Sequence, residues 1–317
     1  MVKILANDGI DESGVKLLEA SGFQVDTTNI PQDELPARIN EYEVLLVRSA
    51  TKVRKDLIDV ATNLKMIGRG GVGMDNIDVD YAREKGINVF NTPAASTTSV
   101  AELVFSHLFS IVRFLQVTNR VMPNEGDSEF KELKKYSSKG SELKGKTLGL
   151  IGFGRIGQDT ARIAAGVGMN VIAHDPFIAS AEITVNVLGQ DVKATINTVS
   201  KDEVLKQADF VSLHVPFSAG QTPIIGQPEI DMMKHGAGIV NCARGGAVDE
   251  KALLAALNSG KIAYAGLDVF EQEPPVFLDI LKPDNVSLTP HIGAQTEEAQ
   301  LRVGAELAES IISFYKN

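Results

Sequence analysis

Residues 146–176, KTLGLIGFGRIGQDTARIAAGVGMNVIAHDP, contain the pattern that decides the fold of this chain. A short apolar run, Thr147 to Ile151, is typical of a buried parallel strand and ends at a glycine. Three glycines follow in the spacing GxGxxG, and apolar residues then recur at helical spacing until Gly168. A second strand-like run, Asn170 to Ala173, leads to Asp175. This order of strand, loop, helix, strand and acid predicts a dinucleotide-binding βαβ unit.

Each glycine of this loop has a physical reason. Gly152 permits a tight turn, Gly154 lets a pyrophosphate approach the backbone, and Gly157 lets the helix pack closely on the strand. The N–H groups at the start of the helix, with its positive dipole end, would face the phosphates. Asp175 is placed to accept a hydrogen bond from a ribose 2′-hydroxyl and would repel a 2′-phosphate. The sequence therefore predicts NAD rather than NADP.

A second GxGxxG, at Gly68, Gly70 and Gly73, follows another apolar run. Polar, turn-like residues come next instead of a periodic helix, and no carboxylate occupies the position of the ribose acid. We therefore reject this segment as a second cofactor loop. Its backbone N–H groups beside Arg69 are suited to holding an anion.

The composition excludes several classes of protein. The 317 residues suffice for about two domains, and the hydrophobic fraction of 44% is ordinary for a globular protein. A net charge of −10 argues against a general nucleic-acid binder. The single cysteine, Cys242, excludes an intramolecular disulfide and fits a reducing compartment. The first residues lack a signal peptide's apolar region, and no run approaches the roughly 20 apolar residues of a membrane span, so we expect a cytoplasmic protein.

Both halves of the chain alternate strand and helix patterns. The first 90 residues contain five apolar strand-like runs, and residues 147–290 contain about six. The predicted fold class is α/β, with two doubly wound parallel-sheet domains. Serines and threonines at 96–99 are expected to cap one long helix, Val100 to about Val121, which is apolar on more than one face. We expect an extended arm from Met122 to Gly145 and an irregular region at 176–199.

Three ionisable residues follow three successive strands of the second domain: Arg244, Glu273 and His291. The carboxyl ends of parallel strands converge on one crevice, so these side chains can meet. The guanidinium of Arg244 can bind a carboxylate and polarise a carbonyl oxygen. His291 can remove or return a hydroxyl proton as hydride leaves for the cofactor. Glu273 on the other ring nitrogen would fix the tautomer, so the set predicts oxidation of an alcohol beside an anion.

Other polar residues have weaker signals. Arg48 follows a buried strand of the first domain, which favours a ligand contact over a plain surface position. His214, at a strand end, favours cofactor contact over proton transfer. Cys242 has no apparent base partner, so a nucleophilic role is not expected. No metal site is predicted. Structural roles are assigned to the remaining histidines, His107, His174 and His235.

The segments GFGRIG, HDP, LHVP, NCARGG, GLDVFEQEPP and PHIGAQT, in this order and spacing, resemble the D-2-hydroxyacid dehydrogenases over essentially the whole chain. Within that family RSATKV, GRGGVGMDNID, NTPAASTTSVAE and HIGAQTEEAQ are most similar to members that oxidise 3-phospho-D-glycerate with NAD. The resemblance implies a flavodoxin-like substrate domain, residues 1–97 plus 291–317, and a Rossmann NAD-binding domain, residues 98–290. It also implies a homodimer with the long helix at its interface.

The resemblance implies a role for each residue singled out above. His291 would be the general acid/base, Glu273 would orient it, and Arg244 would bind the substrate carboxylate and carbonyl. Further substrate contacts would come from Arg48, Ser49, Gly70, Gly71 and Val72. A basic residue of the partner's arm, at the position of Lys134, Lys135 or Lys139, would complete a phosphate site. The implied NAD contacts are Gly152, Gly154, Arg155, Ile156, Gly157, Asp175, His214, Val215, Pro216, Cys242, Ala243, Arg244, Asp268, His291, Gly293 and Ala294.

Two alternatives stay open: a glyoxylate/hydroxypyruvate or D-lactate-type reductase, and an NAD(H)-sensing binding protein on the same fold. The chain also departs from the family pattern. Val72 stands where some relatives have threonine near the nicotinamide, so its contact would be made by the backbone. The sequence ends at Asn317, just after the expected returning helix, so we expect the serine-sensing domain of longer relatives to be absent.

Overall fold

The computed structural model describes every residue except Ala219 and Asn317, and the chain divides into two compact units. Unit 1 comprises Met1–Ser99 and Ala294–Asn317, and unit 2 comprises Val100–Gly293. The sequence placed these breaks after residues 97 and 290. Each unit is built on a parallel sheet with helices on its faces, so the predicted α/β fold class is confirmed.

Unit 1 contains a five-stranded sheet in the order β2-β1-β3-β4-β5, with every neighbouring pair parallel. This is the flavodoxin-like order. All four residues of β3 are buried, because helices cover both faces of such a sheet. The strands are β1 (Lys3–Ala6), β2 (Gln24–Asp26), β3 (Val44–Val47), β4 (Met66–Arg69) and β5 (Asn88–Asn91). The helices are α1 (Glu12–Ala20), α2 (Leu35–Arg38), α3 (Lys55–Val60), α4 (Val79–Glu84) and α12 (Glu297–Lys316).

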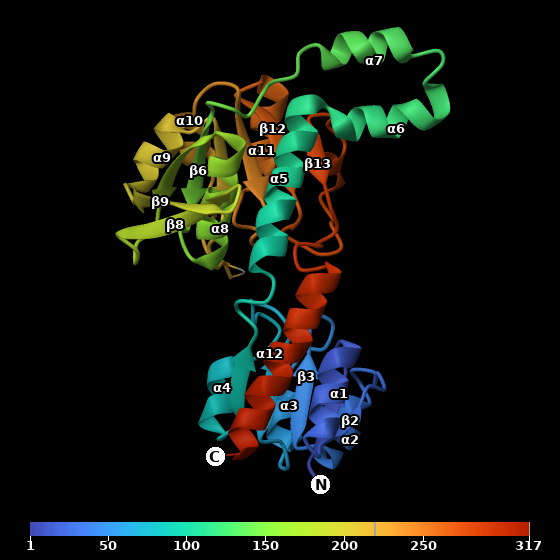
Figure 1. Ribbon diagram of the computed structural model, residues 1–317. Helices are drawn as coiled ribbons and strands as arrows, with labels where there is room; N and C mark the ends of the chain where they lie inside the picture. The colour runs from blue at the N-terminus through green and yellow to red at the C-terminus, as the bar shows by residue number, and fades with distance from the viewer. Residues whose placement is uncertain (219, 317) are drawn as a thin grey trace. The chain divides into compact units, whose positions relative to one another are not determined.

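The C-terminal helix α12 belongs to unit 1, where it lies beside α1 (Figure 1). Its buried face, which includes Val303, Leu307 and Ile311, packs with apolar residues of the sheet. Glycines allow the close approach of the two helices, because a Cβ on Gly14 would lie 2.8 Å from the carbonyl oxygen of Gly304. The chain thus returns to its first sheet.

Unit 2 contains a six-stranded parallel sheet in the order β13-β12-β11-β10-β6-β7. Beyond β7, Thr198 forms a single parallel bridge with Ala173, so the third strand of the Rossmann order is reduced to one pair. The strands are β6 (Thr147–Ile151), β7 (Asn170–His174), β10 (Phe210–Leu213), β11 (Ala237–Asn241), β12 (Ile262–Leu267) and β13 (Val286–Leu288). The helices include α8 (Arg155–Val167), α9 (Lys201–Gln207), α10 (Gln227–Met232) and α11 (Glu250–Ser259).

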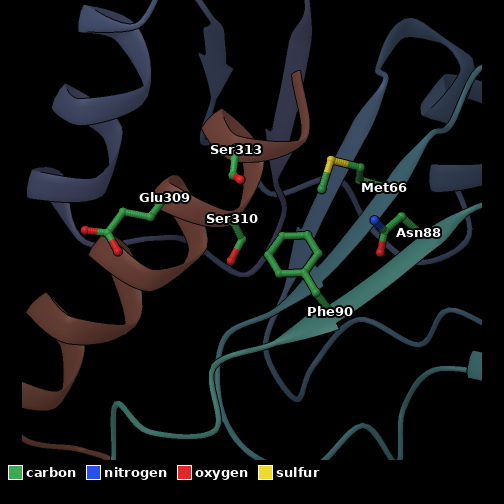
Figure 2. Close-up of a pocket in the computed structure, with 6 residues that line it drawn as sticks. All are labelled: Met66, Asn88, Phe90, Glu309, Ser310 and Ser313. Carbon is green, nitrogen blue, oxygen red and sulfur yellow. The ribbon is translucent and has the colours of Figure 1, made fainter. Parts of the chain in front are cut away.

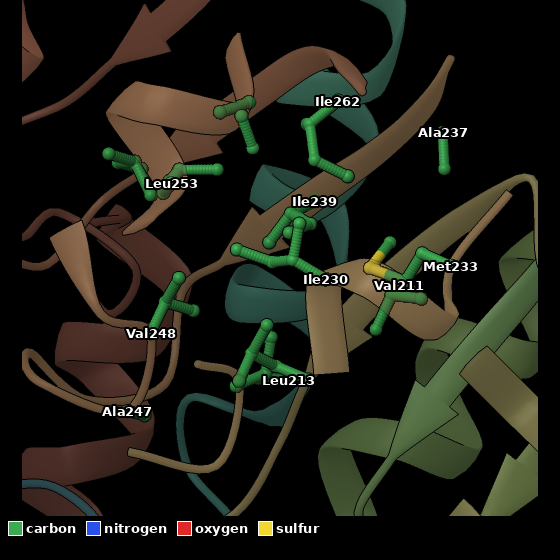
Figure 3. Packing of buried hydrophobic residues seen from close by; sticks show 14 of the residues in the cluster. Val211, Leu213, Ile230, Met233, Ala237, Ile239, Ala247, Val248, Leu253 and Ile262 are labelled. Atoms are coloured by element: carbon green, nitrogen blue, oxygen red, sulfur yellow. The ribbon is translucent and has the colours of Figure 1, made fainter. Parts of the chain in front are cut away.

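Figure 3 shows the larger core of unit 2, in which Val211, Ile239 and Ile262 extend from three neighbouring strands. Leu253 of α11 and Ile230 of α10 pack against them, and all five side chains are fully or almost fully buried. Burying a side chain of this size contributes roughly 1.5–3 kcal/mol. This core fixes the strands whose carboxyl ends carry the candidate site.

The expectation of one long helix from Val100 to about Val121 is wrong. The segment is divided into α5 (Thr97–Arg113) and α6 (Leu115–Glu125), which bend by 65° because Phe114 adopts φ 57°. The left-handed conformation costs about 1 kcal/mol. Burial of the Phe114 ring, with its centroid 4.8 Å from that of Tyr136 and 6.1 Å from that of Tyr264, offsets this cost.

Two further segments differ from the expectation. The arm expected to be extended contains α7 (Phe130–Ser137), and in Figure 1 α6 and α7 extend away from the sheet of unit 2. Residues 176–199 contain an antiparallel hairpin of β8 (Ser180–Val187) and β9 (Gln190–Asn197). Its two-residue turn has positive φ at Leu188 (51°) and Gly189 (86°), which is a primed turn.

None of the described helices is by itself long and apolar enough to cross a membrane. Taken together, α5 and α6 have the length and the apolar composition of a membrane span, but the two helices bend by 65° where they meet.

Candidate active site

The glycine loop of unit 2 connects β6 to α8. A Cβ on Gly152 would lie 2.5 Å from the His214 carbonyl oxygen, and one on Gly157 would lie 2.3 Å from the Gly152 carbonyl oxygen. Neither position can therefore carry a side chain without rearrangement. A Cβ on Gly154 would meet nothing within 4 Å, so the backbone there is open to a ligand. The first and third glycines serve packing and the second serves access, which fits a bound pyrophosphate.

Asp175 ties the end of β7 to this loop. Its Oδ2 accepts a hydrogen bond from Phe153 N–H at 2.8 Å, and its Oδ1 accepts from Phe177 N–H at 2.9 Å and Ile178 N–H at 3.1 Å. A carboxylate has roughly four acceptor positions, so these three bonds leave capacity for a ribose hydroxyl. The charge that is expected to select NAD is thus held in place beside the loop.

His214 follows β10 and its ring lies close to the glycine loop. Its Nε2 is 3.0 Å from Ser212 Oγ, and a Cβ on Gly157 would lie 3.8 Å from the ring. Burial lowers the pKa of His214 to about 3, so the imidazole is neutral. Burial raises the pKa of the Cys242 thiol, which agrees with the expectation that this cysteine is not a nucleophile.

Glu273 and His291 form a hydrogen-bonded pair, with 2.7 Å between Glu273 Oε2 and His291 Nδ1. Burial acts to raise the pKa of Glu273, but the hydrogen bond and charge of His291, Phe270 N–H and the charge of Arg244 outweigh it, and the pKa is lowered. An ionised Glu273 can only accept, so Nδ1 of His291 carries the proton. Nε2 is then the ring atom that can take a substrate proton.

The turn that carries His291 is fixed by Asp268. His291 adopts φ 55°, and its N–H donates to the Asp268 carbonyl oxygen at 2.8 Å. The Asp268 carboxylate accepts from Ile292 N–H at 2.7 Å and from Gly293 N–H at 2.9 Å. Asp268 is 1% exposed, and burial raises its pKa against these bonds. The geometry gives Asp268 a role in holding the turn, while its contact with NAD stays a prediction.

Arg244 lies in the loop after β11, close to the hydrogen-bonded pair of Glu273 and His291. A Cβ on Gly245 would lie 1.7 Å from the Phe270 carbonyl oxygen, so only glycine permits this approach of the two loops. Asn241 Nδ2 donates to the Arg244 carbonyl oxygen at 2.8 Å and steadies the turn. The positive charge of Arg244 contributes to the lowered pKa of Glu273. Residues from the ends of three successive strands are thus brought together.

A cavity of about 430 Å³ borders this group. Glu273, His291 and Thr289 line it, and the remaining lining residues are apolar: Phe270, Pro274, Pro275, Leu281, Leu288 and Pro290. Such walls reduce the access of water and strengthen the interactions of the pair's charges.

In unit 1, Arg48 follows β3 and its backbone is held on both sides. Its N–H donates to Asp8 Oδ2 at 2.7 Å, and Asn76 Nδ2 donates to its carbonyl oxygen at 2.9 Å. The guanidinium reaches Gln295 Oε1 at 3.4 Å. Neither supporting residue was expected from sequence, because Asp8 stands outside the segments that carry the family resemblance. Asn76 stands within one of them, GRGGVGMDNID, but was given no role. Their support leaves the Arg48 side chain at the carboxyl end of its strand.

The glycines after β4 require a correction. Gly70 N–H donates to the Val47 carbonyl oxygen at 2.9 Å, and Gly71 N–H donates to Thr92 Oγ1 at 2.7 Å. These two N–H groups are therefore not open donors for a substrate anion, contrary to the expectation. Val72 N–H donates to no acceptor among the described residues, so its amide is open.

Ser49 is exposed, and Lys52 lies beside it with Nζ 3.1 Å from the Ser49 carbonyl oxygen. Lys52 is a second cation in the segment that follows β3, and it was not among the residues expected from sequence. In a run of polar residues after a strand, sequence alone does not indicate which side chain contacts which backbone group.

Figure 2 shows a second cavity, which lies in unit 1, has a volume of about 390 Å³ and is lined by Met66, Asn88, Phe90, Glu309, Ser310 and Ser313. Met66 and Asn88 are the first residues of β4 and β5, so the cavity lies at the opposite end of the sheet from Arg48. Its lining contains a carboxylate and no lysine or arginine, which makes it unsuited to an anionic substrate.

A Rossmann sheet with a glycine loop, a closing acid and an arginine, glutamate and histidine at strand ends defines a nicotinamide-dependent dehydrogenase. Residues 105–293 match the family model described as D-isomer specific 2-hydroxyacid dehydrogenase, NAD binding domain. The chain belongs to this family, and these residues are its NAD-binding domain.

Two proteins that are similar to the chain at nearly equal identity carry different names. It is 48% identical to the D-3-phosphoglycerate dehydrogenase of Methanocaldococcus jannaschii over 98% of its own length and 57% of that protein. It is 46% identical to the hydroxypyruvate reductase of Thermotoga maritima over 98% of its own length and 97% of that protein. The NAD+-bound 3-phosphoglycerate dehydrogenase of Entamoeba histolytica is similar with a TM-score of 0.79 and 28% identity, covering 100% of this chain and 96% of that one. The chain thus spans little more than half of the Methanocaldococcus protein.

Proposed function

We propose that this chain catalyses the NAD-dependent oxidation of 3-phospho-D-glycerate to 3-phosphohydroxypyruvate, the first step of the phosphorylated route to serine. The observation that supports the chemistry is the 2.7 Å contact between Glu273 and His291, with Arg244 close by. The 48% identity to a D-3-phosphoglycerate dehydrogenase supports the choice of substrate.

In this mechanism Arg244 binds the substrate carboxylate and polarises the oxygen that becomes the carbonyl. His291 Nε2 accepts the hydroxyl proton, and Glu273 holds Nδ1–H and stabilises the imidazolium that forms. NAD, when bound, supplies the acceptor for the hydride that leaves the carbon bearing that hydroxyl. One proton and one hydride leave the alcohol, and the product is a ketone. His291 releases its proton to water before the next turnover.

A phosphorylated substrate has a second anionic end that Arg244 cannot also neutralise. We assign this phosphate to Arg48, with Ser49 and the N–H of Val72 as further donors. Lys52 adds positive charge beside Ser49. Arginine binds phosphate in a two-pronged geometry that suits this task.

A second candidate function is reduction of hydroxypyruvate or glyoxylate. The 46% identity to the Thermotoga maritima hydroxypyruvate reductase, over 97% of that protein, supports it. The deciding experiment compares kcat/KM for NAD-linked oxidation of 3-phospho-D-glycerate, D-glycerate and D-lactate with reduction of hydroxypyruvate and glyoxylate. Highest efficiency with the 3-phospho substrates supports the proposal, and highest efficiency with the unphosphorylated keto acids supports the reductase. NAD binding without turnover of any acid would indicate a sensor.

We also propose a homodimer that buries α5, α6 and α7 of each copy. Apolar side chains on these helices are exposed in the single chain: Phe109, Leu115 and Met122 are each 44% exposed and Phe130 is 56% exposed. Patches of this kind commonly mark protein–protein contacts.

Cys242 is a free thiol, which supports a cytoplasmic location. The proposed dimer is tested by light scattering of the purified protein, which distinguishes a monomer from a dimer.

A further inference from the structure

A chain of buried and partly buried hydrogen bonds runs from helix α5 to the turn that carries His291. Ser287 Oγ lies 2.9 Å from His107 Nδ1, and His107 Nε2 lies 3.1 Å from Thr289 Oγ1. Thr289 Oγ1 in turn donates to Asp268 Oδ1 at 2.6 Å. All four residues belong to unit 2. The histidine interpreted from sequence as structural is therefore connected to the candidate site.

The direction of each hydrogen bond can be worked out from the carboxylate. Ionised Asp268 only accepts, so the single hydroxyl proton of Thr289 points at Asp268. Thr289 Oγ1 can then only accept from the imidazole, which places a proton on His107 Nε2. Neutral His107 has no proton left for Nδ1, so the hydroxyl of Ser287 donates to it.

The surroundings of His107 agree with this assignment. His107 is 1% exposed, and burial lowers its pKa to about 4, so the ring is neutral near pH 7. A Cβ on Gly266 would lie 2.7 Å from the His107 Cβ, so the histidine packs directly on the backbone of β12. The ring therefore has little room to turn away from Thr289.

The far end of the chain is the carboxylate that shapes the His291 turn. Asp268 Oδ1 accepts a hydrogen bond from the Thr289 hydroxyl and another from Ile292 N–H at 2.7 Å. Asp268 Oδ2 accepts a hydrogen bond from Gly293 N–H at 2.9 Å. The turn needs this support because His291 has φ 55°, a conformation that costs a non-glycine residue about 1 kcal/mol. A rotation of the carboxylate would displace the backbone on which the imidazole stands.

We propose that His107 is a positioning residue for His291: its Nε2–H fixes the Thr289 hydroxyl, which fixes Asp268, which holds the His291 turn. This inference rests on the proposed function, because it takes His291 as the acid/base. His107 itself does not contact the substrate or the reacting atoms. It acts through its hydrogen bond to Thr289, the hydrogen bond of Thr289 to Asp268, and the two backbone N–H groups that Asp268 accepts.

Two substitutions of His107 separate this role from simple packing. His107→Gln retains an amide N–H near the position of Nε2, and His107→Asn retains one near Nδ1 only. We expect kcat to stay within about threefold of wild type for His107→Gln and to fall by about tenfold or more for His107→Asn, because small misplacements of a reacting group are costly. KM for NAD should change little in both. Ser287→Ala is the matched control, since it removes the other hydrogen bond of the same ring and should leave kcat near the wild-type value.

Amide hydrogen exchange of the NAD-free protein provides a readout that needs no activity. Protection of Ile292 and Gly293 N–H should fall in His107→Asn and persist in His107→Gln and Ser287→Ala. If wild type oxidises or reduces none of the acids, the proposed function fails, and the exchange result still tests the hydrogen-bonded chain. The positioning role is overturned if His107→Asn keeps wild-type kcat and protection. It is also overturned if Ser287→Ala loses as much kcat as His107→Asn, since the loss would then follow stability rather than Nε2.

Discussion

Nδ1 of His291 lies 2.7 Å from Oε2 of Glu273, a residue 18 positions earlier in the chain. The pKa of Glu273 is lowered, because His291, Phe270 N–H and Arg244 together outweigh the effect of burial. The carboxylate therefore stays ionised below the usual pH range of a glutamate and keeps the ring in the tautomer that leaves Nε2 open. This relationship makes the catalytic proposal testable residue by residue.

Replacement of His291 by alanine should lower kcat by roughly 10²–10⁴-fold, the usual contribution of general acid–base catalysis. The dissociation constant of NAD should change little, because the glycine loop and Asp175 do not depend on the imidazole. Steady-state kinetics and isothermal titration calorimetry with NAD measure the two quantities. His235→Ala, at an exposed histidine, is the control. A loss of less than about tenfold would remove His291 from the role of acid/base.

Glu273→Gln should reduce kcat less than His291→Ala does, because the amide can still hold the ring. The substitution removes the negative charge that stabilises the imidazolium formed during oxidation. The acid limb of the kcat/KM profile for oxidation should therefore move to lower pH. The profile is measured from about pH 5 to pH 9 in both proteins. A profile identical to wild type would show that Glu273 is not the partner that matters.

Wild type should use NAD in preference to NADP, because Asp175 repels a 2′-phosphate and loses its hydroxyl partner. Asp175→Asn removes the charge and keeps one oxygen for the N–H groups of the loop, so it should narrow the ratio of kcat/KM for NAD over NADP. The two cofactors are compared at a fixed substrate concentration. An efficiency with NADP equal to that with NAD in wild type contradicts the assignment.

Much of unit 2 could be predicted from sequence because its signals are local. Each glycine of GxGxxG is required by a contact within the same βαβ unit, such as the 2.3 Å approach at Gly157. The meeting of Arg244, Glu273 and His291 followed from a single rule, that parallel strands end at one edge of a sheet. These predictions needed no knowledge of distant contacts.

The remainder depends on contacts that sequence spacing does not reveal. The break at Phe114 arises from rings at Tyr136 and Tyr264, which the chain order does not place beside it. The hairpin at 180–197 turns at Leu188-Gly189, which is a weak turn signal compared with Asn-Gly. The N–H of Gly71 was expected to be free for a substrate anion, but it donates to Thr92 Oγ1, 21 residues away. Nothing near His107 in the sequence connects it with the site, because its partners lie about 180 residues further along the chain.

Buried His107 should make stability depend on pH. The unfolded chain protonates this histidine near pH 6.5, whereas the folded chain does so only near the lowered pKa of about 4. The unfolded state therefore binds more protons in this window, so stability falls as the pH falls through it. Between about pH 7 and pH 5 the loss from this residue should be about 2 kcal/mol.

Urea unfolding of wild type and His107→Gln at these two pH values measures this loss of stability. The variant should lose less stability on acidification, while His214, whose pKa is lowered to about 3, contributes equally to both proteins. His235→Ala, at an exposed site, should retain the full wild-type dependence. Equal pH dependence in wild type and His107→Gln would mean that His107 is not held neutral.

Arg48→Ala tests the substrate phosphate. The contacts that shape this loop use the backbone of Arg48, since Asp8 accepts from its N–H and Asn76 donates to its carbonyl oxygen. The substitution therefore removes the guanidinium and leaves the loop in place. KM for 3-phospho-D-glycerate should rise about 10–100-fold, the value of a charged hydrogen bond, while KM for D-glycerate should change little. Arg54→Ala, which removes an exposed arginine paired with Asp78, is the control. If Arg48→Ala weakens both substrates equally, Arg48 serves the carboxylate or the fold, and the phosphoglycerate assignment loses its physical support.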